Sequence, residues 1–124
     1  MHKILLVEDD DGLSRMYQRM LSIDGYTVER AADGEQGFEL AKTFQPDLIL
    51  LDMMMPKMNG FQTLDILKAE PTTAKIPIFI LSNVAGVSEA ELAVQKGADK
   101  YLNKSVYEPE QILDIISSHF YSHP

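Results

Sequence analysis

The sequence predicts an α/β fold, an open and doubly wound sheet of five parallel strands with helices on both of its faces. Short aliphatic runs of strand length alternate with longer stretches of helical period along all 124 residues. The alternation repeats five times, which is too few for an eight-stranded barrel. No linker, repeat or low-complexity stretch separates the units, so we expect residues 1–124 to form a single domain.

The first two units end near residue 45. The aliphatic run Lys3–Val7 predicts a buried strand, and apolar residues at helical spacing from Asp11 predict a helix that stops at the "DGY" turn. Tyr26–Arg30 is the second predicted strand. Asp33 is a favourable N-cap for the next helix, which we expect to end before Pro46 because the residue before a proline avoids helical geometry.

The third unit begins with the predicted strand Asp47–Leu51. Asn59 can cap the helix that follows, and the segment "PTTAK" predicts the loop after that helix. The fourth strand is predicted at Ile76–Leu81, where Pro77 is tolerable because it lies near the start of the strand.

The last two helices are predicted from their terminal signals. Ser88 and Glu91 predict a capping box at the start of the fourth helix, and Gly97 predicts its end. The short strand Lys100–Leu102 follows, and Pro109 is favourable in the first turn of the final helix. In doubly wound sheets ligands bind beyond the carboxyl ends of the strands, so we expect the functional residues directly after the strands.

The composition excludes several classes of function. The chain has no cysteine, so disulfides and thiolate chemistry are excluded, and a zinc site would need the scattered residues His2, His119 and His123. The net charge of −8 opposes binding to nucleic acid or anionic lipid. The longest apolar runs are far shorter than the roughly 20 residues of a membrane span. We therefore expect a cytoplasmic protein that contacts neither nucleic acid nor membrane directly and binds a polar protein or a cation.

Three loops bring acids or a cation to one edge of the predicted sheet, and a fourth adds polar groups. Two carboxylates about 4 Å apart repel each other by about 4 kcal/mol at an effective dielectric of about 20, so acids gathered there need a cation. All candidate ligands are hard oxygens, which favours Mg²⁺ or Mn²⁺ over zinc or copper. The strand-end residues are Glu8, Asp9 and Asp10 after the first strand, Asp52 after the third, Ser82 and Asn83 after the fourth, and Asn103 and Lys104 after the fifth.

This combination of groups predicts phosphoryl chemistry. A divalent ion with open positions, a lysine, a hydroxyl and a carboxylate on a rigid strand are the parts that phosphoryl transfer needs. Asp52 would be the nucleophile that forms an aspartyl phosphate, and Lys104 would hold charge on the phosphoryl oxygens. Ser82 would donate its hydroxyl to the new phosphoryl group.

Four segments match a known family. The segments "ILLVEDD", "DLILLDMMMPKMNG", "IPIFILSN" and "GADKYLNK" occur in the order and spacing of the receiver domain of two-component response regulators. From Lys3 to about Phe120 the chain therefore resembles the CheY-like superfamily. The resemblance implies a flavodoxin-like (βα)5 receiver fold with the strand order 2-1-3-4-5.

The resemblance also implies a donor and a metal site. A sensor histidine kinase or a histidine phosphotransfer protein would phosphorylate Asp52. Glu8, Asp9 and Asp52 would hold Mg²⁺ together with the backbone carbonyl of Met54, and Lys104 would contact the phosphoryl group. The chain would not be an enzyme, because it would catalyse only its own phosphorylation and dephosphorylation.

The resemblance further implies a switch. Ser82 takes the place of the family's Ser/Thr switch, and Tyr101 that of its aromatic switch, for which a plain core aromatic is the alternative. An unknown output protein or a second copy of the chain would dock on the fourth helix, the fifth strand and the fifth helix. A kinase would approach the first helix, whose solvent side is predicted to include Ser14, Arg15 and Gln18.

Two features depart from the family pattern. The family's lysine is usually followed by a proline in a cis peptide, whereas Ser105 follows Lys104. A cis bond before serine costs roughly 2.5–4 kcal/mol, so we expect this loop to be trans or strained. Met54 and Val84 occupy positions that look onto the phosphoryl group in the family. Their apolar side chains cannot orient a hydrolytic water, so we predict slow loss of the phosphoryl group.

Three other functions compete with this interpretation. An aspartate-nucleophile phosphatase would need a general acid two residues after Asp52, where Met54 stands. A flavodoxin-like FMN carrier would need bare amides and hydroxyls after the first strand, where "VEDDDGL" places acids. A degenerate interaction domain that works without phosphorylation is left open by Ser105, although Asp9, Asp52 and Lys104 are intact.

Overall fold

The computed structural model describes residues 2–55, 57–83 and 86–122, and it confirms the predicted fold class. Within these residues five parallel strands form one sheet in the order β2-β1-β3-β4-β5. None of the helices in this part of the chain is long and apolar enough to cross a membrane. The strands are β1 (Lys3–Val7), β2 (Thr27–Ala31), β3 (Leu48–Asp52), β4 (Ile78–Ser82) and β5 (Lys100–Asn103), and the helices are α1 (Asp11–Ile23), α2 (Gly34–Phe44), α3 (Gly60–Ala69), α4 (Val87–Gln95) and α5 (Pro109–Ser122).

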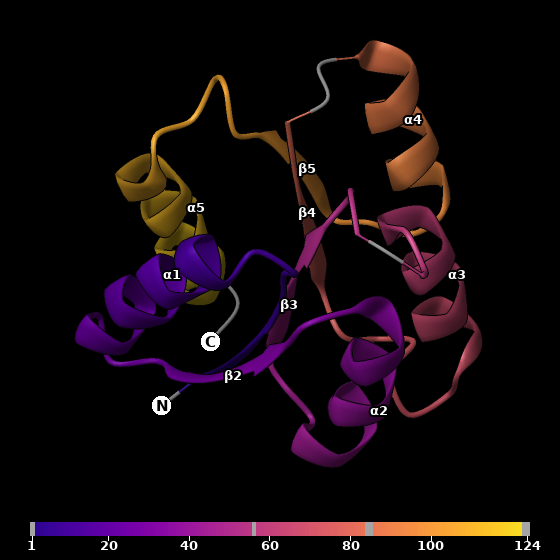
Figure 1. The fold of residues 1–124 in the computed structure, drawn as a ribbon, viewed down its shortest axis with the longest axis horizontal. Helices are drawn as coiled ribbons and strands as arrows, with labels where there is room; N and C mark the ends of the chain where they lie inside the picture. Colours follow the sequence, from indigo (N-terminus) through magenta and orange to yellow (C-terminus); the bar gives the residue numbers. More distant parts are fainter. Residues whose placement is uncertain (1, 56, 84–85, 123–124) are drawn as a thin grey trace.

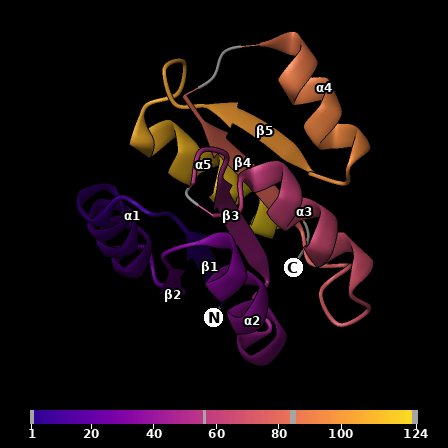
Figure 2. The same cartoon turned by 45° about the vertical axis from the view of Figure 1, so that its right-hand side comes forward.

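Helices cover both faces of the sheet (Figure 1). α1 and α5 lie on one face and α2, α3 and α4 on the other, an arrangement that Figure 2 shows from a second direction. Successive side chains of a strand point to opposite faces, so the sheet separates two apolar cores. Leu5 and Ile49 belong to the core beneath α2 and α3, whereas Ile4 and Phe79 belong to the core beneath α1 and α5. Burial on both faces explains the continuous aliphatic runs of the central strands.

Four strands end one residue later than predicted. β2 ends at Ala31, β3 at Asp52, β4 at Ser82 and β5 at Asn103. In the parallel register Asp52 lies opposite Leu81, and Ser82 lies opposite Asn103. β4 starts at Ile78, so Pro77 precedes the strand. The ladder therefore fixes the backbone of residues that were expected in the loops.

Local signals set most of the helix ends as predicted. Asp33 caps α2 and Asn59 caps α3, each by accepting a hydrogen bond from a backbone N–H three residues later. Gln62 completes a capping box with Asn59. Gly25 and Gly97 follow the ends of α1 and α4 with φ values of 95° and 108°, a left-handed conformation that glycine adopts at little cost.

The start of α4 differs from the prediction. α4 begins at Val87 with Gly86 as its N-cap, and no side chain makes a capping hydrogen bond, so the capping box predicted from Ser88 and Glu91 is wrong. The helix starts two residues earlier than that box requires. Glu89 therefore occupies the third helical position, and its carboxylate lies so close to Gly86 that an added Cβ would collide with it.

The placement of Ser14 is a second correction. The sequence predicts Ser14 on the solvent side of the first helix, together with Arg15 and Gln18, but Ser14 is fully buried. Arg15 is exposed and Gln18 is half-buried. The Ser14 hydroxyl donates a hydrogen bond to the carbonyl of Asp11 (3.4 Å), which satisfies the polar group inside the helix and lets the small side chain face the core.

Candidate functional site

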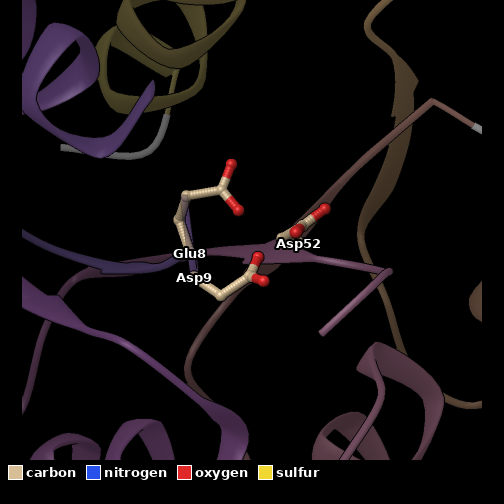
Figure 3. Close-up of side chains that lie close together, drawn as sticks. All are labelled: Glu8, Asp9 and Asp52. Atoms are coloured by element: carbon tan, nitrogen blue, oxygen red, sulfur yellow. The ribbon is translucent and has the colours of Figure 1, made fainter. Parts of the chain in front are cut away.

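Three carboxylates meet at the carboxyl edge of the sheet (Figure 3). Glu8 and Asp9 directly follow β1, and Asp52 ends the neighbouring strand β3. One carboxylate oxygen from each residue lies within 4.8 Å of the other two. Glu8 and Asp52 are only 3% and 8% exposed, whereas Asp9 is open to solvent. A ligand could therefore enter from the side of Asp9 and reach two buried acids.

The strand register brings these acids together. Val7 of β1 lies opposite Leu51 of β3, so the next residues, Glu8 and Asp52, follow at the same level of the sheet. The N–H of Glu8 donates to the carbonyl of Ala31 (3.0 Å), which ties the residue to the end of β2 as well. A buried carboxylate needs a partner because its desolvation costs several kcal/mol. The groups that surround Glu8 and Asp52 therefore define the chemistry of the site.

Lys104 supplies a positive charge to the two buried acids. Its Nζ atom lies 3.3 Å from Oε1 of Glu8 and 3.6 Å from Oδ1 of Asp52. The Lys104 side chain is only 12% exposed. Limited access of water strengthens the attraction between this ammonium group and an ionised carboxylate, relative to pairs on the surface. The structure thus brings together three residues that the sequence predicts at the ends of three different strands.

A tight turn holds Lys104 in place. Its N–H donates to the carbonyl of Ser82 (2.8 Å), which continues the pairing of β4 with β5. The Oδ1 atom of Asn103 accepts hydrogen bonds from the N–H and the hydroxyl of Ser105, at 2.9 and 2.6 Å. No peptide bond among the described residues is cis, so the bond between Lys104 and Ser105 is trans. The lysine reaches the acids through this turn.

The pKa of Glu8 reflects the crowding of negative charge. Burial, followed by a hydrogen bond with Asp52 and the charge of that residue, raises the pKa of Glu8 from 4.5 to about 8, against the opposing effect of Lys104. Burial, with a smaller contribution from Glu8, also raises the pKa of Tyr17 in α1 to about 12. At neutral pH Glu8 therefore holds a proton when no cation is bound. A cation at the site would take over the role of that proton.

The remaining predicted residues that the structure describes differ in how deeply they are buried. Ser82 is fully buried at the end of β4. Tyr101 is half-buried in β5 and packs against the core that includes Ala93 of α4. The side chain of Met54 is 64% exposed, and Val84 lies outside the described residues. The switch roles of Ser82 and Tyr101 and the metal contact of the Met54 carbonyl stay predictions.

Arg30 borders the site but is absent from the predicted set. Its guanidinium donates to the carbonyl of Glu8 through Nε (3.1 Å) and Nη2 (2.9 Å). Its Nη1 atom pairs with Oδ1 of Asp11 at 2.8 Å. Arg30 ends the predicted strand Tyr26–Arg30, so the rule that functional residues lie at strand ends could have found it. The contact with a backbone carbonyl leaves no signal in the sequence.

A separate cavity of about 460 Å³ lies at the opposite edge of the sheet, where the strands begin. His2 and His119 line it together with Asp47 and Asp99. Both histidines stack on or against the ring of Phe120. The two described histidines thus lie away from the carboxylate cluster, and His123 lies outside the described residues.

The donor set of the cluster fits a hard divalent cation. Glu8, Asp9 and Asp52 offer only carboxylate oxygens. Such ligands match Mg²⁺ or Mn²⁺, which bind through one or two carboxylates and keep several open positions. Lys104 contacts the two buried acids and would remain available to an anionic substrate. The site is therefore able to hold a cation and an anion side by side.

Fold and site together define a class, the flavodoxin-like α/β proteins with an acidic site at the carboxyl ends of two adjacent strands. Comparison with known families makes the assignment specific. The family model of the response regulator receiver domain matches residues 4–117, so the chain belongs to this family. The predicted family resemblance is confirmed.

The similar proteins are response regulators. The chain is 42% identical over 112 residues to the nitrate/nitrite response regulator protein NarL of Escherichia coli, and 37% identical over 113 residues to the DNA-binding dual master transcriptional regulator RpaA of Synechocystis sp.. These matches cover 89% and 91% of the chain but only 50% and 46% of the relatives. The chain thus spans about half the length of these relatives, and the DNA binding named for RpaA is a property of that whole protein.

Solved receiver structures have the same fold. The chemotaxis protein CheY4 of Vibrio cholerae superimposes with a TM-score of 0.88 at 29% identity, covering 95% of this chain and 98% of that one. The BeF3-activated N-terminal receiver domain of Klebsiella pneumoniae RstA superimposes with a TM-score of 0.86 at 26% identity, covering 94% and 97%.

Proposed function

We propose that residues 1–124 act as a single receiver domain, the phosphoacceptor of a two-component system or phosphorelay. A phosphoryl group would pass from a phosphohistidine to Asp52 in a Mg²⁺-dependent step. One observation supports this proposal most strongly. The Nζ atom of Lys104 lies 3.6 Å from Oδ1 of Asp52, so a buried carboxylate at a strand end has a fixed cation beside it and an exposed acid, Asp9, at its open side.

Asp52 is the nucleophile in the proposed reaction. One of its carboxylate oxygens attacks the phosphorus of the phosphohistidine. A P–O bond forms while the P–N bond breaks, and the imidazole leaves with the bonding electron pair and takes up a proton. Lys104 is within reach of the phosphoryl oxygens and stabilises their charge. The hydroxyl of Ser82 donates a hydrogen bond to the transferred group.

The acids are assigned to the metal. Glu8, Asp9 and Asp52 would hold Mg²⁺ together with the backbone carbonyl of Met54, and Mn²⁺ could take its place. When bound, the ion would neutralise charge on the phosphoryl oxygens during transfer. Because Asp9 faces solvent, the donor can approach from that side without displacing the buried pair of Glu8 and Asp52.

Phosphorylation is proposed to change the surface formed by α4, β5 and α5. The phosphoryl group adds negative charge and strong acceptor oxygens next to Ser82, and Tyr101 on β5 would repack in response. Near this surface Val87 and Val94 of α4 and Val106 of the following loop are 75%, 56% and 66% exposed. An output protein or a second copy of the chain would dock there on apolar area, and a sensor histidine kinase or histidine phosphotransfer protein would approach α1.

The proposed activity is limited to self-modification in the cytoplasm. The chain would catalyse only its own phosphorylation and dephosphorylation and would act on other proteins by binding. The net charge of −8 opposes direct contact with nucleic acid or an anionic membrane, so contact with DNA would need a further domain.

Intact-mass spectrometry tests the acceptor. Wild type and Asp52→Ala are incubated with acetyl phosphate, with Mg²⁺ or with a chelator, and Asp114→Ala removes an exposed aspartate of α5 as a matched control. We expect wild type and Asp114→Ala to gain one phosphoryl group only with Mg²⁺, and Asp52→Ala to gain none. The same set is then treated with a phosphorylated histidine phosphotransfer protein, because some receivers refuse small donors.

Two outcomes would overturn the proposal. Phosphorylation of Asp52→Ala at the wild-type rate would place the acceptor elsewhere. A wild type that gains no mass from either donor would leave the degenerate, phosphorylation-independent interaction domain as the better description. Continuous release of inorganic phosphate from small phosphomonoesters would instead favour an aspartate-nucleophile phosphatase.

A further inference from the structure

Arg30 is the penultimate residue of β2, and its side chain binds the loop that carries two of the proposed metal ligands. Nε and Nη2 both donate to the carbonyl of Glu8, at 3.1 and 2.9 Å. Nη1 pairs with Asp11 in the first turn of α1 at 2.8 Å. The guanidinium therefore spans the segment from Glu8 to Asp11, and Asp9 lies between its two anchoring points.

Both backbone polar groups of Glu8, the N–H and the carbonyl, form hydrogen bonds with residues of β2. Its N–H donates to the carbonyl of Ala31 at 3.0 Å, and its carbonyl accepts the two hydrogen bonds from Arg30. The first contact is a ladder bond that any residue at position 31 could make. The second depends on one side chain. The direction in which Glu8 points toward Asp52 is thus set in part by the identity of residue 30.

We propose that Arg30 is a positioning residue for the metal site, which fixes the loop from Glu8 to Asp11 so that the carboxylates of Glu8 and Asp9 converge on Asp52. The inference deepens the proposed function and rests on it, because it assumes that these acids hold Mg²⁺. Groups that orient metal ligands without touching the metal commonly change metal affinity by about 10- to 100-fold when they are removed. Arg30 would be such a group, acting through the backbone.

Geometry and charge predict opposite effects of Arg30. A positive charge close to the acids repels Mg²⁺, so a purely electrostatic role predicts tighter binding when Arg30 is neutralised. A positioning role predicts weaker binding, because a loosened loop must be ordered again when the ion binds. The pair between Arg30 and Asp11 is partly exposed, with side-chain exposures of 23% and 75%, so this ion pair by itself contributes little to the stability of the loop. The sign of the change therefore separates the two roles.

The variant Arg30→Lys further distinguishes the positioning role of Arg30 from a role of its charge. Arginine presents several N–H donors in a rigid plane, whereas lysine has one ammonium group on a flexible stem. Arg30→Lys therefore keeps the charge but cannot keep both donors on the Glu8 carbonyl together with the contact to Asp11. Under the positioning role Arg30→Lys resembles Arg30→Gln. Under a charge role it resembles the wild type.

The first test measures Mg²⁺ binding to the unphosphorylated protein by isothermal titration calorimetry. Arg30→Gln and Arg30→Lys are compared with wild type and with Arg19→Gln, which removes a charge from an exposed position of α1. We expect the dissociation constant to rise on the order of 10-fold in both Arg30 variants and to stay at the wild-type value in Arg19→Gln. Unchanged or tighter binding in Arg30→Gln would overturn the inference.

The second test measures the loop without metal. Amide hydrogen exchange at Glu8 reports on the bond from its N–H to the carbonyl of Ala31. We expect faster exchange at Glu8 in both Arg30 variants, with unchanged exchange in β4 and an unchanged urea midpoint. If the amide of Glu8 exchanged as slowly in the Arg30 variants as in the wild type, the positioning role would be refuted even if the variants bound Mg²⁺ more weakly. If the wild type bound no Mg²⁺, the proposed function and this inference would both be refuted. If the wild type bound Mg²⁺ and the Arg30 variants bound it equally tightly, only this inference would be refuted.

Discussion

Replacing Glu8 with glutamine should stabilise the metal-free protein at alkaline pH. Glutamine has nearly the shape of a protonated glutamate but cannot ionise. The pKa of Glu8 rises from 4.5 to about 8, mainly through burial. One pKa unit corresponds to about 1.4 kcal/mol, so ionised Glu8 costs the folded state on the order of 5 kcal/mol. The substitution removes that cost wherever wild-type Glu8 would be charged.

The sign of the effect fixes its pH window. The folded state binds the Glu8 proton more tightly than the unfolded state does, because the folded pKa is the higher one. This contribution to stability is complete below about pH 4.5 and is lost as the pH rises to about 8. The difference in unfolding free energy between Glu8→Gln and wild type should therefore grow across this window and level off above it. Taking the difference cancels the other titrating groups.

Urea unfolding followed by circular dichroism, in chelator at several values from pH 5 to about 9, measures that difference. Glu110→Gln, an exposed position of α5, is the matched control and should show no such trend. Added Mg²⁺ should stabilise wild type above pH 8 more than Glu8→Gln, because the variant replaces one proposed carboxylate ligand by a neutral amide. A difference that stays constant with pH would refute the assignment of the proton to Glu8.

Three further substitutions test other parts of the site. Met54→Asn places a polar side chain two residues after Asp52 and should shorten the lifetime of the phosphorylated protein, followed as loss of mass with time; an equal or longer lifetime would contradict the role of Met54. Lys104→Gln removes the cation beside Asp52, which is proposed to stabilise the phosphoryl group, and should slow phosphorylation by acetyl phosphate on the order of 100-fold. A near-normal initial rate would show that the lysine has another role. Gly60→Ala should lower the unfolding free energy by about 1–3 kcal/mol, because the new Cβ would lie 2.8 Å from Cα of Met53. Urea unfolding checks the last prediction, and unchanged stability would mean that the backbone adapts freely there.

The positions of the acids followed from simple rules. A parallel sheet places the carboxyl ends of its strands at one edge, so acids after the first and third strands had to meet if those strands were neighbours. Asp33 and Asn59 could be recognised as caps because their polar side chains precede apolar helical patterns. These features depend on residues close in sequence, or on a topology that few strand orders satisfy.

Features that depend on unpredicted contacts were missed. α4 begins at Val87 without a side-chain cap, so the true start of the helix leaves no capping signal in the sequence. The pattern at Ser88 and Glu91 was therefore the strongest signal available, and it predicted the wrong start. Ser14 is buried because its hydroxyl bonds to the backbone one turn earlier, which makes a polar residue compatible with the core. The bonds from Arg30 to the Glu8 carbonyl join a side chain to a backbone atom 22 residues away. Residue types alone cannot reveal such a pair.

The proton on Glu8 and the proposed Mg²⁺ would each reduce the repulsion between the clustered carboxylates. Lys104 lies 3.3 Å from Glu8 and 3.6 Å from Asp52, but one lysine cannot neutralise two buried acids with Asp9 beside them. The metal-free site therefore keeps a proton on Glu8 below about pH 8. A cation that uses Glu8 as a ligand must displace that proton, so binding should release about one proton at neutral pH and weaken as the pH falls. Under the proposed function, phosphorylation at Asp52 would then be coupled to the protonation of Glu8.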